Sequence, residues 1–202
     1  MSSIDARAPN KDKPEGARLG WTVLETRYPV RTPWLTLRED LVRIAGYGEI
    51  TFTYSETTPA VHIVPITRLG DIVLIRQYRY PVDSWSLEVP AGGTHDFPGI
   101  PLEEVARVEL EEEIGAVCEE MLPIAVFPMH SAKSAQRGHV FLASGVEFSV
   151  TPHPAATERI TLNVMPIPDA YAMLHAGEIL DCQSAMSLLV CERVLRERGL
   201  LA

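Results

Sequence analysis

The distribution of hydrophobic residues along the first quarter of the chain predicts strands after a polar start. β-Branched and aromatic residues are concentrated over 21–31 and again over 34–54, with Gly46 and Gly48 as interruptions. This pattern is typical of several short strands in a small β-rich layer. The first 20 residues are polar and have no periodicity, so we expect a flexible N-terminal tail there.

Two continuous apolar runs follow, at 60–66 and 72–75, and the turn-like residues 68–71 separate them. They predict a hairpin of well-buried strands. A third strand is expected over 85–89. The Pro-Ala-Gly-Gly sequence at 90–93 must interrupt it, because proline removes a backbone donor and paired glycines allow backbone geometries closed to other residues.

The sequence from 101 to 114 predicts a helix. Pro101 fits its first turn, Glu103 and Glu104 complement the positive end of the helix dipole, and Gly115 supplies a left-handed stop. The other expected elements are three strands and then two helices: 122–127, 139–142, 160–165, 169–175 and 183–198.

Composition narrows the class of protein. With 202 residues, of which 46% are hydrophobic and 22% charged, the chain matches a soluble globular protein of one domain with a small appendage. Its net charge of −9 repels a nucleic acid or an anionic bilayer, which argues against either as the main partner. The same charge is compatible with binding of a divalent cation. We therefore expect no nucleic-acid partner and no membrane partner.

Localisation is expected to be cytoplasmic. No apolar stretch approaches the roughly 20 residues of a membrane helix, and the N-terminus lacks the apolar centre of a signal peptide. The three cysteines, Cys118, Cys182 and Cys191, are scattered and form no CxxC pair. Reduced thiols of this kind are typical of a cytosolic protein.

Four acidic residues occupy five consecutive positions at 109–113. A run of like charge is more often a solvated helix face than a site, and the helical wheel tests this alternative. At about 100° per residue, Glu109, Glu112 and Glu113 fall in the apolar sector of the predicted helix. Partly desolvated like charges repel, so either their pKa values rise or a cation lies among them. Magnesium fits the second case, since it prefers carboxylate oxygens.

The residues 88–92 (EVPAG), followed by 109–115 (ELEEEIG), resemble the Nudix hydrolase signature, in which a glycine loop leads into a helix with the pattern R-E-U-x-E-E-x-G-U. Upstream, 75–81 (IRQYRYP) resembles the ADP-ribose pyrophosphatase branch of that family. The resemblance extends from about Trp21 to the last helix. It implies an α/β fold, a Nudix-like α/β/α sandwich around a mixed β-sheet with a small N-terminal β layer.

Three departures from the family pattern leave a second interpretation open. The interval from Gly92 to Glu109 is two residues longer than in the family, Ile100 stands where a loop glutamate is expected, and Val108 replaces an arginine. These changes motivate the alternative of a catalytically impaired Nudix-fold protein that binds or senses a nucleotide.

The resemblance also implies a metal site. Glu109, Glu112, Glu113 and the backbone carbonyl of Ala91 would hold one or more Mg²⁺ ions, with Mn²⁺ as a substitute, and Glu112 and Glu113 would be catalytic. Clustered metals can neutralise a diphosphate and activate water for its cleavage.

The general base is a separate question. Glu158, in a segment rich in loop-forming residues, is the candidate for this role, and a surface acid is the equally weighted alternative. Glu147 is a weaker competitor. Gln136 stands where relatives often carry another glutamate, and His95, in the lengthened loop, is kept as a possible substrate contact.

Substrate binding is assigned to four residues. Arg79 and Arg76 would grip the diphosphate through their guanidinium forks, the alternative being an ion pair at a strand edge. Trp34, with Tyr28, would contact a nucleobase, the alternative being that these aromatic side chains fill the core of the β layer. The resemblance implies that the layer at 21–57 is a dimerisation element, so a homodimer is expected.

The implied function is that of an enzyme, a Nudix-type pyrophosphohydrolase. It would cleave, with a metal ion, the pyrophosphate of a nucleoside diphosphate linked to another moiety. ADP-ribose or a related nucleotide sugar is the expected substrate, and ADP-ribose would give AMP and ribose 5-phosphate. The expected organisation is a tail at 1–20, the β layer at 21–57 and the catalytic domain at 58–202.

Overall fold

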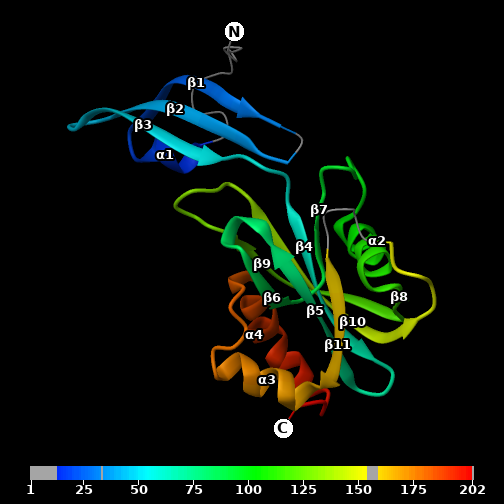
Figure 1. Ribbon diagram of the computed structural model, residues 1–202. Coiled ribbons are helices and arrows are strands. Elements are labelled where there is room, and N and C mark those ends of the chain that lie inside the picture. Colours follow the sequence, from blue (N-terminus) through cyan, green and yellow to red (C-terminus); the bar gives the residue numbers. More distant parts are fainter. Residues whose placement is uncertain (1–12, 33, 154–158, 202) are drawn as a thin grey trace. The chain divides into compact units, whose positions relative to one another are not determined.

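The computed structural model describes residues 13–32, 34–153 and 159–201. Contacts between residues divide the chain into two compact units, whose elements are labelled in Figure 1. Each unit is described below by itself.

The N-terminal unit comprises Met1–Thr58 together with Pro128–Gln136. A segment from the second half of the chain therefore belongs to the first unit. Local sequence patterns did not indicate this, because the attachment depends on contacts between positions far apart in the sequence.

An antiparallel sheet of three strands forms this unit, in the order β1 (Trp21–Arg31), β2 (Thr36–Ile44) and β3 (Gly48–Ser55). This agrees with the strands predicted from the aromatic and β-branched residues. Gly46 and Gly48 adopt positive φ values of 76° and 129° in the β2–β3 connection, a geometry that glycine adopts easily.

A short helix, α1 (Pro14–Arg18), precedes the sheet. The prediction of a tail over residues 1–20 was therefore wrong for this stretch, and residues 1–12 lie outside the described part. Pro14 occupies the first turn, where its missing N–H costs nothing, and Arg18 pairs with Glu15 one turn away. A helix of five residues is too short to show a periodicity in the sequence.

The C-terminal unit comprises Pro59–Phe127 and Arg137–Ala202. Its sheet has the strand order β11-β5-β4-β10-β8, with β6 on β5, β7 on β4 and β9 on β10. β10 runs parallel to β4, whereas β5 is antiparallel to β4 and to β11, so the sheet is mixed. The strands are β4 (Ala60–Thr67), β5 (Asp71–Arg79), β6 (Ser84–Glu88), β7 (Ala91–Gly93), β8 (Ala116–Val117), β9 (Glu120–Pro128), β10 (Arg137–Phe148) and β11 (Ile160–Pro166).

Helices cover both faces of this sheet (Figure 1). The helix α2 (Leu102–Ile114) packs on one face, and α3 (Ile167–His175) and α4 (Cys182–Glu197) pack on the other. A 3-10 turn, η1 (Tyr80–Val82), joins β5 to β6. The predicted α/β/α sandwich around a mixed sheet is confirmed.

The two hydrophobic cores follow the alternation of side chains along the strands. In β5, Val73 and Ile75 belong to the core under α2, whereas Ile72 and Leu74 belong to the core under α3 and α4. Successive residues of a strand point to opposite faces, and both faces are covered here. That is why β4 and β5 are apolar runs without a polar face.

Two strands, β7 and β8, were not predicted. The sequence 90–93 was expected only to break the preceding strand, but Ala91, Gly92 and Gly93 pair with β4. Strands of two or three residues are too short to show a period of two. In the described part of the chain, no helix is long and apolar enough to cross a membrane. All three cysteines are free thiols.

The attachment of α2 to the sheet can be tested with Leu110→Ala. Leu110 is fully buried in the core under α2. Its truncation removes apolar contacts and leaves a cavity, so we expect the free energy of unfolding to fall by about 2–5 kcal/mol in urea denaturation. The neighbouring exposed residue gives the matched control, Glu111→Ala, for which we expect a change within about 0.5 kcal/mol. Equal losses in the two variants would contradict this account of the core.

Candidate active site

Three hydrogen bonds hold the backbone between β6 and β7. The N–H of Val89 donates to Ser184 Oγ at 3.0 Å, and the carbonyl of Pro90 accepts from Ile63 N at 2.9 Å. The N–H of Ala91 donates to Glu113 Oε2 at 3.0 Å. The turn is therefore fixed from α4, from β4 and from α2, and this fixes the peptide that carries the Ala91 carbonyl.

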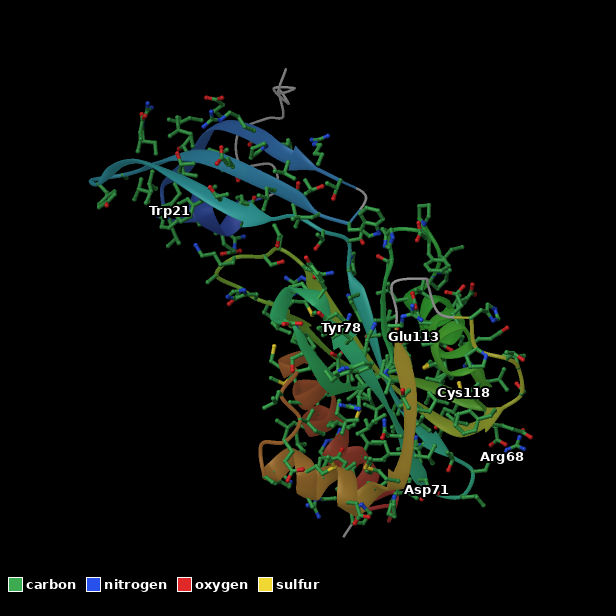
Figure 2. All side chains as sticks on the ribbon, viewed as in Figure 1. Trp21, Arg68, Asp71, Tyr78, Glu113 and Cys118 are labelled. Carbon is green, nitrogen blue, oxygen red and sulfur yellow. The ribbon has the colours of Figure 1, made fainter. Side chains whose placement is uncertain are left out.

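Glu113 is buried although it carries a carboxylate, with only 4% of the residue exposed. Figure 2 shows it on α2, facing the sheet. A buried carboxylate needs hydrogen-bond donors to offset its loss of water, and the Ala91 N–H is one of them. The helical wheel predicted this inward position correctly.

Glu109 lies one helical turn before Glu113, with its carboxylate over the backbone of β7. A Cβ atom added to Gly92 would lie 1.9 Å from Cδ of Glu109, so a side chain at residue 92 and the present position of Glu109 exclude each other. Glycine at position 92 thus creates the space in which the Glu109 carboxylate lies beside the turn.

Glu112 is the third acid of the predicted set, and its residue is exposed. Its backbone carbonyl, in the last turn of α2, accepts a hydrogen bond from His153 N at 2.9 Å. Within the described ranges, no three side chains of His, Cys, Asp or Glu are already gathered as a metal site. The structure therefore brings Glu109, Glu113 and Ala91 together and leaves Glu112 toward solvent.

The donors at the turn nevertheless match a hard divalent cation in their chemistry. Glu109 and Glu113 offer carboxylate oxygens, and Ala91 offers a backbone carbonyl whose peptide is held in place. The space over Gly92, which a Cβ would fill, is occupied by an oxygen donor. These residues fit a hard divalent cation.

Arg79 pairs with Glu88 across the β5–β6 strands. Its Nε donates to Oε1 at 2.9 Å and its Nη2 to Oε2 at 2.5 Å. Glu88 is buried, with 3% exposed, and its hydrogen bonds raise the pKa of Arg79. The strand-edge ion pair considered for Arg79 is thus present, but Nη1 of the half-exposed guanidinium makes no hydrogen bond to any described residue.

Arg76 points to the other face of β5, because it lies three positions before Arg79 in an extended strand. It is exposed, and its guanidinium lies 4.9 Å from the ring centroid of Trp85. The structure therefore does not bring the two arginines to one site, and Arg76 is better explained as a cation–π partner of Trp85.

Trp34 and Tyr28 belong to the N-terminal unit. Trp34 is 78% exposed, whereas Tyr28 is buried and is covered by the guanidinium of Arg31 at 3.9 Å from its ring centroid. Trp34 is thus available for stacking on a ligand, and Tyr28 matches the core-filling alternative.

The predicted general base, Glu158, lies outside the described residues. The weaker competitor, Glu147, forms an exposed ion pair with Arg68 at 2.7 Å. The amide Nε2 of Gln136 donates to the carbonyl of Thr58 at 2.9 Å. His95 Nε2 lies 2.9 Å from the carboxylate of Asp96.

Sequence reasoning missed the support that α4 gives to the turn. Asp181 caps α4, accepting from both the N–H of Ser184 (2.7 Å) and its hydroxyl (2.6 Å), while Ser184 Oγ accepts from Val89 N. The D-x-x-S sequence signals a helix start. Nothing in it indicates that the same serine reaches a strand 95 residues earlier.

His62 was also missed. It pairs with Ala91 in the β4–β7 register and is almost fully buried, and burial lowers the pKa of its imidazole to about 4. Its ring stacks on Phe127 with the centroids 6.0 Å apart. His62 is therefore a neutral, packed side chain under the turn and not a source of charge at the site.

The segment after β10 is tied to the end of α2. The N–H groups of Ser149 and Val150 donate to the carbonyl of Gly115 at 3.0 and 3.1 Å. A Cβ on Gly115, whose φ is +68°, would lie 2.4 Å from the Val150 carbonyl oxygen. Glycine is required here for the close approach as well as for ending the helix.

A comparison with family models matches residues 56–180 to the NUDIX domain. The chain belongs to the Nudix family. This match includes the turn and α2, and it ends just before α4, whose Ser184 supports the turn. Nudix enzymes generally use divalent metal ions, in agreement with the donors at the turn.

Two relatives of this Nudix protein are ADP-ribose pyrophosphatases. One, from Mycobacterium tuberculosis, is 30% identical over 162 residues, which are 78% of this chain and 76% of the relative. The other, from Bacillus subtilis, is 27% identical over 132 residues, or 64% of this chain and 69% of the relative. A methanol dehydrogenase activator from Bacillus methanolicus is 33% identical over 87 residues, 43% of this chain and 46% of the relative.

Among solved structures, the crystal structure of an ADP compounds hydrolase has a TM-score of 0.73 to this chain at 19% identity, covering 98% of this chain and 99% of that one. It shows that the fold is shared. Together with the family match and the relatives, the comparisons support a Nudix pyrophosphohydrolase, and so an enzyme over the alternative of a binding protein without turnover.

The role of Gly92 can be tested with Gly92→Ala. The added Cβ takes the space of the Glu109 carboxylate, so the Glu109 side chain must move away from the β6–β7 turn. Because Glu109 is half-exposed, its side chain can do so while α2 stays folded. We expect Mn²⁺ affinity, measured by electron paramagnetic resonance titration, to fall at least about tenfold with the loss of one anionic oxygen ligand. Gly93→Ala is the matched control, since its Cβ would only approach the His95 ring at 3.1 Å. Unchanged Mn²⁺ affinity in Gly92→Ala would remove Glu109 from the metal site.

The bond from α4 to the turn can be tested with Ser184→Ala. The buried N–H of Val89 then has no acceptor, so we expect the free energy of unfolding to fall by about 1–3 kcal/mol in urea denaturation. The matched control is Ser187→Ala on the same helix, because the buried Ser187 hydroxyl only donates to the Gln183 carbonyl. If both variants lose the same stability, the bond to Val89 contributes nothing specific.

Proposed function

We propose that this Nudix protein hydrolyses the diphosphate of a nucleoside diphosphate linked to another moiety, with ADP-ribose as the first substrate to test. The products from ADP-ribose are AMP and ribose 5-phosphate. The observation that carries the proposal is the bond between the buried Glu113 carboxylate and the Ala91 N–H, which joins the acidic helix to the turn. The names of the relatives from M. tuberculosis and B. subtilis support the choice of substrate.

The proposed metal ligands are Glu109, Glu112, Glu113 and the Ala91 carbonyl, with Mg²⁺ as the ion and Mn²⁺ as its substitute. When bound, such an ion neutralises phosphate charge and lowers the pKa of a coordinated water. Glu112 is exposed on the last turns of α2 and is not packed in the core. Its side chain can therefore rotate toward the ion.

Arg79 is the proposed phosphate ligand. Glu88 holds its Nε and Nη2, which fixes the plane of the guanidinium, and Nη1 remains for an anionic oxygen. The pairing with a buried carboxylate orients Arg79 in advance, so its ordering costs little when substrate binds. Arg76, on the other face of β5, is not part of this proposal.

Glu158 remains the proposed general base. Trp34 is the proposed nucleobase contact, since its large aromatic surface is exposed. We further propose that the β layer mediates homodimerisation and that the protein acts in the cytoplasm. Sedimentation velocity of the intact chain tests the first of these, with a single monomer species as the contrary result.

The decisive experiment measures Mg²⁺-dependent release of AMP from ADP-ribose by wild type and Glu113→Gln. Glutamine keeps the shape and an oxygen acceptor for the Ala91 N–H but lacks the negative charge, so we expect kcat/KM to fall at least about 100-fold with the fold intact. The matched control is Glu111→Gln, on the exposed side of the same helix, with turnover within about twofold of wild type.

Two outcomes would contradict the proposal. Undiminished turnover in Glu113→Gln removes the acidic helix from the chemistry. Absence of Mg²⁺-dependent hydrolysis of ADP-ribose and of nucleotide sugars by the wild-type enzyme rejects the substrate class.

A further inference from the structure

A cavity of about 500 Å³ lies within the N-terminal unit. Its walls come from α1, from one face of the three-stranded sheet and from residues 131–135. The last two walls are joined at Ser55, whose N–H donates to the Lys133 carbonyl and whose carbonyl accepts from Ala135 N, both at 2.9 Å. The volume is in the range of sites for small molecules.

Two stacked aromatic rings line this cavity. The rings of Trp21 and Phe52 stack with their centroids 5.6 Å apart and an interplanar angle of 21°. Phe52 is 37% exposed, so its ring is accessible from the cavity. Figure 2 shows Trp21 beside α1 at the start of the sheet. Such a surface favours a planar ring as the bound group.

Asp40 is the one acidic residue among the described residues that line the cavity, and its carboxylate accepts hydrogen bonds from three donors. These are the Thr26 hydroxyl at 2.6 Å, Arg38 Nε at 2.9 Å and the Tyr54 hydroxyl at 2.9 Å. Burial and the charge of Asp40 raise the pKa of Tyr54, which keeps its proton on this bond. Arg38 also pairs with Glu56 at 3.0 Å, so its charge is shared between two carboxylates and only partly offsets the charge of Asp40.

The chain has only three lysines, Lys11, Lys13 and Lys133, against a net charge of −9. Lys13 and Lys133, separated by most of the sequence, both line this cavity. Neither forms an ion pair with an acidic residue in the described part of the chain, and Lys13 Nζ lies 4.6 Å from the ring centroid of Tyr54. Two lysines among the lining residues, one of them beside the Tyr54 ring, favour an anionic group in this cavity.

We propose that this cavity binds a small anion that carries a flat aromatic ring, an aromatic phosphate or carboxylate. The ring packs on Trp21 and Phe52, and the anionic group lies against the ammonium groups of Lys13 and Lys133. All the described residues that line the cavity belong to the N-terminal unit, and none belongs to the turn or to α2. Binding there goes beyond the proposed hydrolysis and does not depend on it.

The test titrates the full-length protein with 1-naphthyl phosphate by isothermal calorimetry, with the indole N–H signal of Trp21 as a local reporter in nuclear magnetic resonance. The ring alone, as 1-naphthol, and inorganic phosphate alone are the two partial probes. We expect saturable binding of 1-naphthyl phosphate that shifts the Trp21 signal and weakens as KCl is raised, and at least about tenfold weaker binding of either partial probe.

The double variant Lys13→Met/Lys133→Met is expected to bind 1-naphthyl phosphate about tenfold more weakly. The matched control is Arg43→Met, which removes one positive charge that pairs with Glu49 on the same sheet outside the cavity, and it should bind as wild type does. Glu113→Gln should also keep this affinity, which distinguishes the cavity from the α2 site. Unchanged thermal melting of the lysine variant confirms that its fold is intact.

Three results would overturn the proposal. One is equal affinity for 1-naphthol and 1-naphthyl phosphate, since the anion would then not be recognised. Another is undiminished binding by the lysine variant. The third is absence of saturable binding of 1-naphthyl phosphate by the wild-type protein. If the lysine variant also changes its oligomeric state, this face is a contact between copies of the chain.

Discussion

The hydrogen bond from the Ala91 N–H to the Glu113 carboxylate joins the two parts on which the site depends. A backbone carbonyl serves as a ligand only when its peptide plane is fixed, and a buried carboxylate persists only when donors replace its lost water. This one bond meets both needs at 3.0 Å. The packing of α2 on the sheet and the anchoring of the turn from α4 keep its two partners in place.

The elements of the fold could be predicted from the sequence because their signals are local. Proline at the start, two glutamates in the first turn and Gly115 at the end place a helix at 101–114, and the structure has it at Leu102–Ile114. The continuous apolar runs of β4 and β5 reflect burial on both faces of the sheet. Helical periodicity was also enough to place Glu109 and Glu113 on the inner side of α2.

The remaining features depend on contacts that no local pattern encodes. Glu112 shares a sector of the helical wheel with Glu109 and Glu113, but the residue is exposed in the structure. The register of β5 and β6 places Ser84 opposite Arg79 and Glu88 opposite Ile75, so the pairing of Arg79 with Glu88 also depends on the arginine side chain reaching along the strand. Likewise, the attachment of residues 128–136 to the N-terminal unit and the reach of Ser184 to Val89 are visible only once the chain has folded.

Gly115 has a consequence for how the site can move. Its carbonyl receives two N–H groups of the segment after β10, and the Glu112 carbonyl receives a third from His153. Residues 149–153 are therefore tied to the end of α2 by three hydrogen bonds, so a tilt of the helix would pull on this segment. The segment that leads toward residue 158 starts from the same scaffold that carries the acidic residues. In the proposed mechanism with Glu158 as the base, the described chain that precedes it is anchored to the helix that carries the acidic residues.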